Sequence, residues 1–524
     1  MANDVPTTAL SPIVEIVSGR LRGITSGGIH AFKGIPYAAP PVGPNRFRPP
    51  QPAQPWAGVR EASAYAGHAW QSPLRPKRRP ELDRLLGPAD DTPEGEDCLT
   101  LNVWTPDLDK GKRPVMVWLH GGAFAYGSGN RAVTDGANLA RRGDVVVISV
   151  NHRLNIFGFL HLADLGGERF AGSGNAGMLD QIAALEWVRD NVAGFGGDPG
   201  NVTIFGESGG GGKVSALLAM PAAQGLFHRA IVQSGAAIRM TARERANALA
   251  AAVLAQLGIG KNECDRLQDV PPQQLLAAIA PASRAAGPRP FPLLDRYDFG
   301  PVVDGADLPQ HPFDPAAPAA SAAIPLLVGG TKDESSLFLT EDEPYWTGTL
   351  TEAALRARIA AVAGDDADAV IAAYRERLPS ATPAELLVAV LTGSNFWIRS
   401  VLLAERRTAL GGAPVYMYSL DWGTPTHGGR LRAHHAIDLP FVFDRTEVPE
   451  TTAGIPGAAE LAAVVSATWA AFARHGRPDT PAIPDWPPYT ETGRATMIFD
   501  AVCRIERDPD RAARMAWSEA ALRG

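Results

Sequence analysis

The sequence predicts an α/β fold in which helices cover both faces of a mostly parallel central sheet. Short apolar runs bounded by turn residues recur along the chain and are typical of buried strands. Segments with helical periodicity lie between them, and this alternation is typical of a parallel sheet. The chain has 524 residues, of which 45% are apolar and 20% charged. It can therefore bury a large core, and its composition is that of an ordinary globular protein.

The strands of this sheet are predicted from a set of apolar runs. They lie at 115–119, 145–150, 202–205, 230–233, 324–328 and 415–420. The N-terminal segments 14–24 and 31–37 resemble a hairpin that precedes the parallel part. Because chemistry gathers at the carboxyl ends of the strands in such sheets, the residues that follow each run are the candidates for function.

Two helices have clear signals in the sequence. The segment 176–192 places apolar residues on one face and stops at a Gly-Phe-Gly-Gly sequence. Thr241 and Glu244 have the spacing of a capping box, from which we expect a helix that runs to Gly258.

The domain organisation is predicted to be simple. The loop 65–96 and the helical block 334–410 look like elaborations that cover a pocket, and neither is bounded by a linker composition. We therefore predict one catalytic domain over residues 1–524, without internal repeats.

Charge and cysteine patterns exclude several classes of protein. The formal net charge is -7 and no long block of either sign occurs, so no nucleic-acid partner is expected. One basic cluster at 75–79 is interrupted by proline and is expected to be a solvated loop. Cys98, Cys264 and Cys503 lack the spacing of a disulfide framework or a zinc site. With no leader-like N-terminus and no apolar span of about 18 residues, we expect a cytoplasmic protein that does not enter a membrane.

The heptapeptide Phe-Gly-Glu-Ser-Gly-Gly-Gly at 205–211 follows a predicted strand and precedes a helical pattern. This is the context of a G-x-S-x-G nucleophile elbow, in which a strained turn exposes a serine hydroxyl. The alternative is a glycine-rich turn with an incidental serine, in a chain that contains 54 glycines. The elbow is favoured because the other parts of a serine hydrolase follow other strands. Ser208 is the predicted nucleophile.

A glycine-rich loop, His-Gly-Gly-Ala-Phe at 120–124, follows the strand 115–119. A loop in this place supplies backbone N–H groups to an oxyanion. We assign the donors to Gly122, Ala123 and Gly209. A phosphate-binding loop is disfavoured because no Lys-Ser or Lys-Thr pair follows.

A serine nucleophile needs a base and a group that orients the base. The strand 324–328 is followed by Asp333 and Glu334, and the strand 415–420 by His434 and His435. The residues themselves leave both pairs open. The chain order of serine, acid and histidine is the order found in α/β-hydrolases.

Longer strings make the chain similar to the type-B carboxylesterases, the family of bacterial para-nitrobenzyl esterases, animal carboxylesterases and cholinesterases. They are Phe-Lys-Gly-Ile-Pro-Tyr at 32–37, Glu-Asp-Cys-Leu-Thr-Leu-Asn-Val at 96–103, Asn-His-Arg-Leu at 151–154 and Phe-Val-Phe at 441–443. The pattern most resembles that of the bacterial para-nitrobenzyl esterases. By this resemblance the acid is Glu334 and the base is His435, and Glu207 and Ser234 are polar groups near the histidine.

The sequence departs from the family pattern at two positions. Cys98 matches a residue that is disulfide-bonded in secreted relatives, but the loop 65–71 holds no partner cysteine. This agrees with an intracellular bacterial-type enzyme. Gly209 stands where the family usually has alanine, and its N–H group is retained.

Together these features predict a serine carboxylesterase that cleaves small-molecule esters through an acyl-enzyme, with no cofactor and no metal. Carbamate, lactone or polyester hydrolases, lipases and acyltransferases would use the same machinery and are the alternatives. A non-catalytic adhesion-type relative is disfavoured because Ser208, Glu334 and His435 are all present. The sequence makes no prediction of the oligomeric state.

Overall fold

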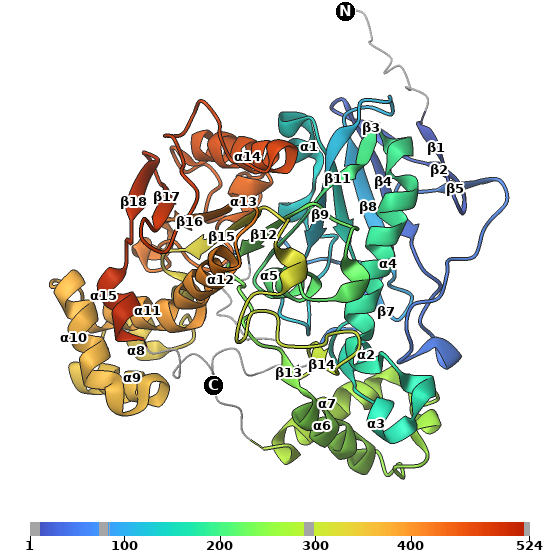
Figure 1. Cartoon of the computed structure of the whole chain (residues 1–524), viewed down its shortest axis with the longest axis horizontal. Coiled ribbons are helices and arrows are strands. Elements are labelled where there is room, and N and C mark those ends of the chain that lie inside the picture. Colours follow the sequence, from blue (N-terminus) through green and yellow to red (C-terminus); the bar gives the residue numbers. More distant parts are fainter. Residues whose placement is uncertain (1–10, 73–81, 83, 288–297, 518–524) are drawn as a thin grey trace, which may run out of the picture.

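The computed structural model describes residues 11–72, 82, 84–287 and 298–517, and the basic cluster at 75–79 lies outside them. Its central feature is one large sheet (Figure 1). The strands from β17 to β10 run parallel, and strands at both edges pair antiparallel, so the predicted fold class is confirmed. In spatial order the strands are β18 (Arg504–Arg507), β17 (Ala495–Phe499), β16 (Val415–Leu420), β15 (Leu326–Thr331), β12 (Arg229–Gln233), β11 (Gly197–Glu207), β9 (Arg113–Leu119), β10 (Val146–Val150), β8 (Thr100–Thr105), β4 (Ile29–Pro36) and β3 (Ile24–Ser26).

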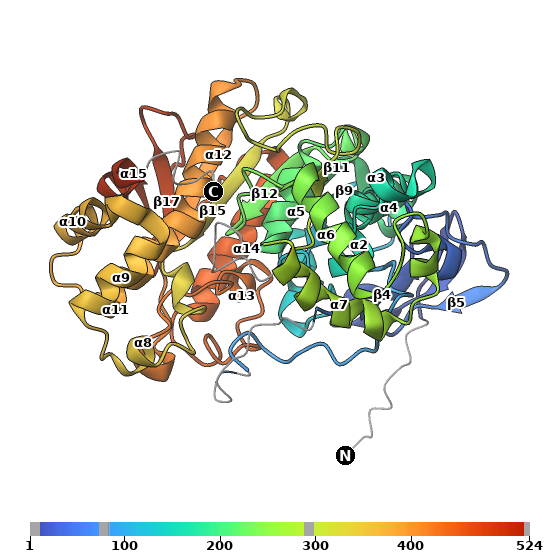
Figure 2. The same cartoon turned by 90° about the horizontal axis from the view of Figure 1, so that it is seen from below.

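Each face of the sheet carries its own apolar core. Along β9, Val117 belongs to one core and the next residue, Trp118, to the other, because alternate side chains of a strand point to opposite faces. Helices cover both cores, as the two perpendicular views show (Figures 1 and 2). The first core includes α4 (Ala176–Asn191), α5 (Gly209–Leu217) and α12 (Ile398–Ala409), and the second includes α1 (Ala137–Gly143) and α14 (Ala458–His475).

The predicted strands are found in place, and two of them extend further at their carboxyl ends than predicted. β15 continues to Thr331 because Gly329 and Gly330 keep pairing with β16. β11 reaches Glu207 because it keeps pairing with β12. Both extensions bring the strand ends closer to the candidate residues Glu334 and Ser208.

The N-terminal prediction of one hairpin is wrong, since the region forms two. β1 (Ile13–Ile16) and β2 (Gly19–Arg22) pair with each other and form a separate sheet with β5 (Val59–Glu61). β3 and β4 form a second hairpin, which joins the main sheet. Gly27 and Gly28 make this second turn possible, with φ of 55° and 77°.

The predicted capping box is also wrong. Thr241 lies in the short strand β13 (Thr241–Ala242), which pairs with β14 (Val302–Val303). The helix α6 (Arg243–Gln256) begins after it, with Ala242 as its N-cap and no side-chain cap. Strand pairing has therefore replaced the local cap that the sequence pattern predicted.

The block 334–410 is helical, as predicted, and has an apolar core of its own to one side of the sheet (Figure 1). The helix Pro383–Ala409 has 27 residues and passes a test of length and composition for a membrane span, yet 83% of its most apolar window is buried inside the protein. Such burial is typical of a core helix. The helix Pro383–Ala409 consists of α11 (Pro383–Thr392), the π-helix η12 (Gly393–Trp397) and α12. The other helices are α2 (Asn155–Phe159), α3 (Ala163–Gly166), α7 (Pro272–Ala285), α8 (Glu343–Thr347), α9 (Glu352–Ala363), α10 (Ala367–Arg377), α13 (Leu439–Val442) and α15 (Arg511–Ala516).

Candidate active site

Ser208 lies in the turn between β11 and α5. Its φ of 56° and ψ of -122° are rare for a residue with a side chain and mark a strained turn of the kind that occurs at functional sites. Ser208 N donates to Gln233 O at 2.8 Å, and Gly212 N donates to Ser208 O at 3.1 Å. A Cβ at Gly210 would lie 2.0 Å from Leu119 O, so the turn requires glycine there. The backbone thus forms the predicted elbow, with Ser208 half-buried at the edge of the sheet.

The loop 120–124 follows β9 and lies beside this turn. Gly122 and Ala123 have φ of 88° and 52°. Gly121 O accepts from His120 Nδ1 at 2.8 Å. Gly122 O accepts from the N–H groups of Ala125 and Tyr126 at 3.2 and 3.1 Å. The C=O and N–H of a trans peptide point in opposite directions. The hydrogen bonds to Gly121 O and Gly122 O fix two peptide planes. The N–H groups of Gly122 and Ala123 belong to these planes and point to the side opposite the bonded carbonyls.

The predicted oxyanion donors lie close to one another. A Cβ at Gly209 would lie 2.1 Å from Ala123 O, so the first residue of α5 is in close contact with the loop. A Cβ at Gly121 would lie 3.5 Å from Ser208 Cβ. The loop therefore packs against both Ser208 and the first residue of α5.

Glu334 and His435 are brought into contact at the same edge of the sheet. Glu334 follows β15, and His435 lies in the loop between β16 and α13. Because β15 and β16 are adjacent and parallel, their carboxyl ends lie together. Glu334 Oε2 lies 2.5 Å from His435 Nδ1, and Glu334 Oε1 accepts from Thr331 N at 2.8 Å. The carboxylate is fully buried and held at both oxygens.

The alternative acid and base contact other groups. Asp333 Oδ2 accepts from Ala433 N at 3.4 Å, and Asp333 lines a cavity of about 430 Å³ that does not include Ser208 or His435 among its lining residues. Burial raises the pKa of Asp333. His434 Nδ1 is 2.7 Å from the backbone oxygen of His435. Of the two pairs that the sequence left open, only Glu334 and His435 meet.

Glu207 lies against the other nitrogen of His435. The distance from His435 Nε2 to Glu207 Oε1 is 3.1 Å. Burial raises the pKa of Glu207 to about 8. Burial lowers the pKa of His435, but the carboxylates of Glu207 and Glu334 outweigh it and raise that pKa to about 9. The site therefore stabilises the protonated imidazole.

In the described part of the chain, no hydrogen bond joins Ser208 Oγ to His435 Nε2. Catalytic hydrogen bonds are often open in the absence of substrate and close when it binds. The Ser208 hydroxyl can rotate about χ1, whereas His435 is fixed by its contacts to Glu334 and Glu207.

Ser234 and Asp438 surround the acid and the base. Ser234 is 1% exposed, and a Cβ at Gly330 would lie 3.1 Å from its hydroxyl and 2.5 Å from Glu334 Oε1. The sequence analysis missed Asp438, whose Oδ2 accepts from Gln233 Nε2 at 2.7 Å. Burial raises the pKa of Asp438 to about 6. A carboxylate three residues after the predicted histidine was the available signal.

Two aromatic rings also contact His435, and the sequence analysis missed both. The ring centroids of Phe338 and Phe396 each lie 5.0 Å from that of the imidazole. Phe338 follows the acid by four residues, which could have indicated its place. Phe396 arrives from the π-helix η12, a rare irregularity that often marks functional sites. No local pattern in the sequence indicates this bulge.

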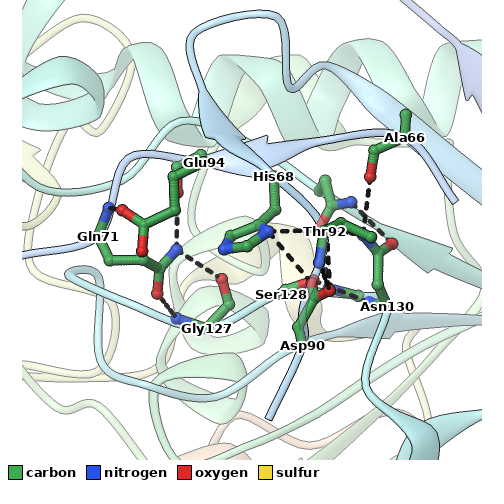
Figure 3. A network of polar contacts seen from close by, with 12 residues as sticks. Ala66, His68, Gln71, Asp90, Thr92, Glu94, Gly127, Ser128 and Asn130 are labelled. Carbon is green, nitrogen blue, oxygen red and sulfur yellow. Dashed lines mark hydrogen bonds and ion pairs between the residues drawn. The ribbon is translucent and has the colours of Figure 1, made fainter.

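The loop 65–96 is tied to the segment that follows the oxyanion loop (Figure 3). Gln71 Nε2 donates to Gly127 O at 3.1 Å, and Gly127 N donates to Gln71 Oε1 at 2.7 Å. Ser128 Oγ donates to Asp90 Oδ2 at 2.5 Å. A Cβ at Gly127 would lie 2.5 Å from Gly121 O, so the tied segment packs directly on the oxyanion loop.

Among the described residues, no group of three or more His, Cys, Asp or Glu side chains could hold a metal ion. Cys98, Cys264 and Cys503 are all free thiols.

Known proteins resemble the chain over almost its whole length. A model of the carboxylesterase family matches residues 10–516. The chain is 40% identical over 502 residues to the para-nitrobenzyl esterase of Bacillus subtilis (strain 168), covering 95% of this chain and 96% of that protein. A solved carboxylesterase of Geobacillus stearothermophilus superposes with a TM-score of 0.82 at 40% identity, covering 97% and 100%. An esterase of Clostridium hathewayi, described as able to hydrolyse aliphatic aromatic polyesters, superposes with a TM-score of 0.81 at 36% identity, covering 97% and 98%.

Proposed function

The chain belongs to the carboxylesterase family and is a carboxylic ester hydrolase, and we propose that Ser208, His435 and Glu334 form its catalytic triad. The observation that carries this proposal is the 2.5 Å contact between Glu334 Oε2 and His435 Nδ1. It joins two loops that are 101 residues apart in sequence, at the edge of the sheet where the strained Ser208 lies.

In the first half of the reaction, Ser208 Oγ attacks the ester carbonyl carbon while His435 Nε2 takes the hydroxyl proton. The Nδ1–H group of His435 donates to Glu334, which fixes the tautomer and stabilises the imidazolium. The negative charge that develops on the carbonyl oxygen is held by the N–H groups of Gly122, Ala123 and Gly209. His435 then gives the proton to the departing alkoxide, which leaves as the alcohol.

In the second half, water attacks the acyl-enzyme by the same route. His435 takes a proton from the water, the oxyanion forms again in the same place, and Ser208 Oγ leaves with the proton returned by His435. Atoms and charges balance without a metal or an organic cofactor.

Glu207 is proposed to tune the base rather than to react. Its carboxylate lies 3.1 Å from His435 Nε2, which favours the imidazolium that each half of the reaction produces. Ser234 is proposed to be a buried polar neighbour of the acid, since a Cβ at Gly330 would lie close to both the Ser234 hydroxyl and Glu334 Oε1.

The walls of the pocket are proposed to come from the segments 65–96 and 334–410. The second supplies Phe338 and Phe396, the rings against His435, and the first is tied to the oxyanion loop through Gln71. The polyester hydrolysis described for the Clostridium hathewayi esterase is the second candidate activity, because that esterase matches 97% of this chain.

Rapid-mixing kinetics with para-nitrophenyl acetate test the proposal. An acyl-enzyme that forms faster than it hydrolyses gives a burst of para-nitrophenol close to one equivalent per chain. Ser208→Ala should abolish the burst and lower kcat by about 10⁴-fold or more. Turnover by Ser208→Ala within tenfold of the parent would contradict the assignment. A polyester film assayed beside the soluble ester decides between the two candidate substrates.

A further inference from the structure

Lys213 is a buried lysine beside the proposed site, and the mechanism above does not use it. It lies in the helix α5, which begins directly after Ser208, and its side chain is 0% exposed. Lysine is almost never fully buried unless it is paired, because removing its charge from water is costly. Because a buried lysine lowers the stability of the folded protein, we expect its contacts to have a role in the site.

The Lys213 ammonium contacts the first residue of the oxyanion loop. Its Nζ donates to His120 O at 2.7 Å. It also lies 5.6 Å from the ring centroid of Phe124, at the other end of the same loop. Lys213 therefore reaches both ends of the segment 120–124 from within α5.

The contact to His120 completes a series of held carbonyls. Lys213 holds His120 O, the His120 ring holds Gly121 O, and the turn after the loop holds Gly122 O. Each contact fixes one peptide plane, and the N–H group of each plane points the opposite way. Among these donors, only Lys213 lies outside the oxyanion loop and the turn that follows it. It therefore anchors the loop to the helix that carries the nucleophile.

The surroundings of Lys213 keep this contact in place. His120 and His152 stack with ring centroids 4.9 Å apart. Burial, and next to it the charge of Lys213, lowers the pKa of both imidazoles, so both are neutral. Burial lowers the pKa of Lys213 to about 7, and the Glu207 carboxylate opposes that shift. The amine and the ammonium both carry N–H donors, so either form can hold His120 O.

We infer that Lys213 is a positioning residue for the reaction, which fixes the first peptide plane of the oxyanion loop by holding the His120 carbonyl and so anchors the Gly122 and Ala123 planes that follow it. The inference rests on the proposed role of the Gly122 and Ala123 N–H groups. It assigns Lys213 an effect on the transition state, because the oxyanion is fully formed only there.

The test is Lys213→Met in the full chain, which removes the donor and keeps a flexible side chain of similar length. Removing one oxyanion donor outright costs about 10²- to 10³-fold in kcat, so loosening the loop should cost about 10- to 100-fold. KM for a para-nitrophenyl ester should stay within about twofold, because an interaction made in the transition state does not contribute to substrate binding.

Arg407→Met is the matched control. Arg407 is another buried cation that donates to backbone carbonyls, here Gly411 O at 2.8 Å and Ile324 O at 3.1 Å, and it lies at the end of α12 outside the site. Its replacement should lower the melting temperature and leave kcat per active site unchanged. Lys213→Gln is the second variant in case the methionine variant does not fold, and it carries the same expectation because its side chain is one bond shorter.

Active sites are counted by titration with a fluorophosphonate, so that unfolded protein does not enter kcat. A 10- to 100-fold lower kcat per titrated site with an unchanged KM supports the inference. A kcat per site within twofold of the parent, or a loss that appears only in KM, overturns it. The proposed triad is judged separately, because its failure would appear as a missing Ser208 label in the parent protein itself.

Discussion

The two sides of the active site are built in different ways. The nucleophile side is a backbone structure, in which glycines let α5 touch the oxyanion loop and hydrogen bonds hold three successive carbonyls of that loop. The histidine side is made of side chains from distant parts of the chain, with Glu334, Glu207 and Phe396 converging on one imidazole. The first side should therefore tolerate almost no added atom, whereas the second should respond to substitutions by graded changes in rate and pKa.

The largest expected effect tests whether the histidine side uses the residues that meet in the structure. Glu334→Gln and His435→Ala should each lower kcat by about 10⁴-fold or more, because each breaks the catalytic unit. Asp333→Asn and His434→Ala are the matched controls and should retain kcat within about tenfold. Steady-state kinetics on one para-nitrophenyl ester measure all four, and an inactive His434→Ala beside an active His435→Ala would reverse the assignment.

The next effect tests whether the nucleophile side is packed too tightly to accept an added side-chain atom. Gly210→Ala places a Cβ at a position 2.0 Å from Leu119 O, so the elbow and the end of β9 must move apart. We expect kcat to fall by about 100-fold, since small displacements of aligned groups are costly. Gly225→Ala is a control for glycine replacement, because no atom lies within 4 Å of its Cβ position, although its φ of 78° carries a modest strain of its own. Unchanged kcat in Gly210→Ala would contradict a tightly packed elbow.

A smaller and graded effect is expected from Glu207, the carboxylate proposed to tune the base. His435 must be neutral to accept the serine proton, so kcat/KM should rise with pH through the pKa of His435, which is raised to about 9. Glu207→Gln removes one of the negative charges that raise this pKa, so the rise should move to lower pH by about one unit. A pH profile of kcat/KM for both proteins measures the shift. A profile that stays in place would remove Glu207 from the electrostatics of the base.

The smallest effect is expected from chelators and reductants, on which neither side of the site should depend. The three cysteines are free thiols, and the described residues contain no cluster of metal-binding side chains. Prolonged treatment with EDTA or dithiothreitol should leave kcat and Tm nearly unchanged. Loss of activity on chelation that added zinc or calcium restores would reveal a metal site.

The same contrast explains how much could be predicted from the sequence. Ser208 and the loop 120–124 were predictable because a strained turn and a close backbone contact require glycines at fixed spacing, which the sequence displays directly. The parallel sheet was predictable from apolar runs for the same reason, since its pattern is local.

The surroundings of His435 were less predictable because they depend on packing between distant segments. Spacing could not choose between the adjacent carboxylates Asp333 and Glu334, because only the fold decides which of them faces His435. The position of Phe396 depends on a π-helix within a long helix, and no residue type in the sequence indicates a π-helix there. The capping-box prediction at Thr241 failed likewise, since a strand partner at Val302 outweighed a local preference.

The most direct measurement is to locate the covalent adduct that a fluorophosphonate forms with the full chain. After complete inactivation, mass spectrometry of the intact protein and its peptides should show one label per chain, on Ser208. Ser208→Ala should take up no label under the same conditions. Complete inactivation with Ser208 unmodified, or with the label on another residue, would contradict the proposed acyl-enzyme mechanism.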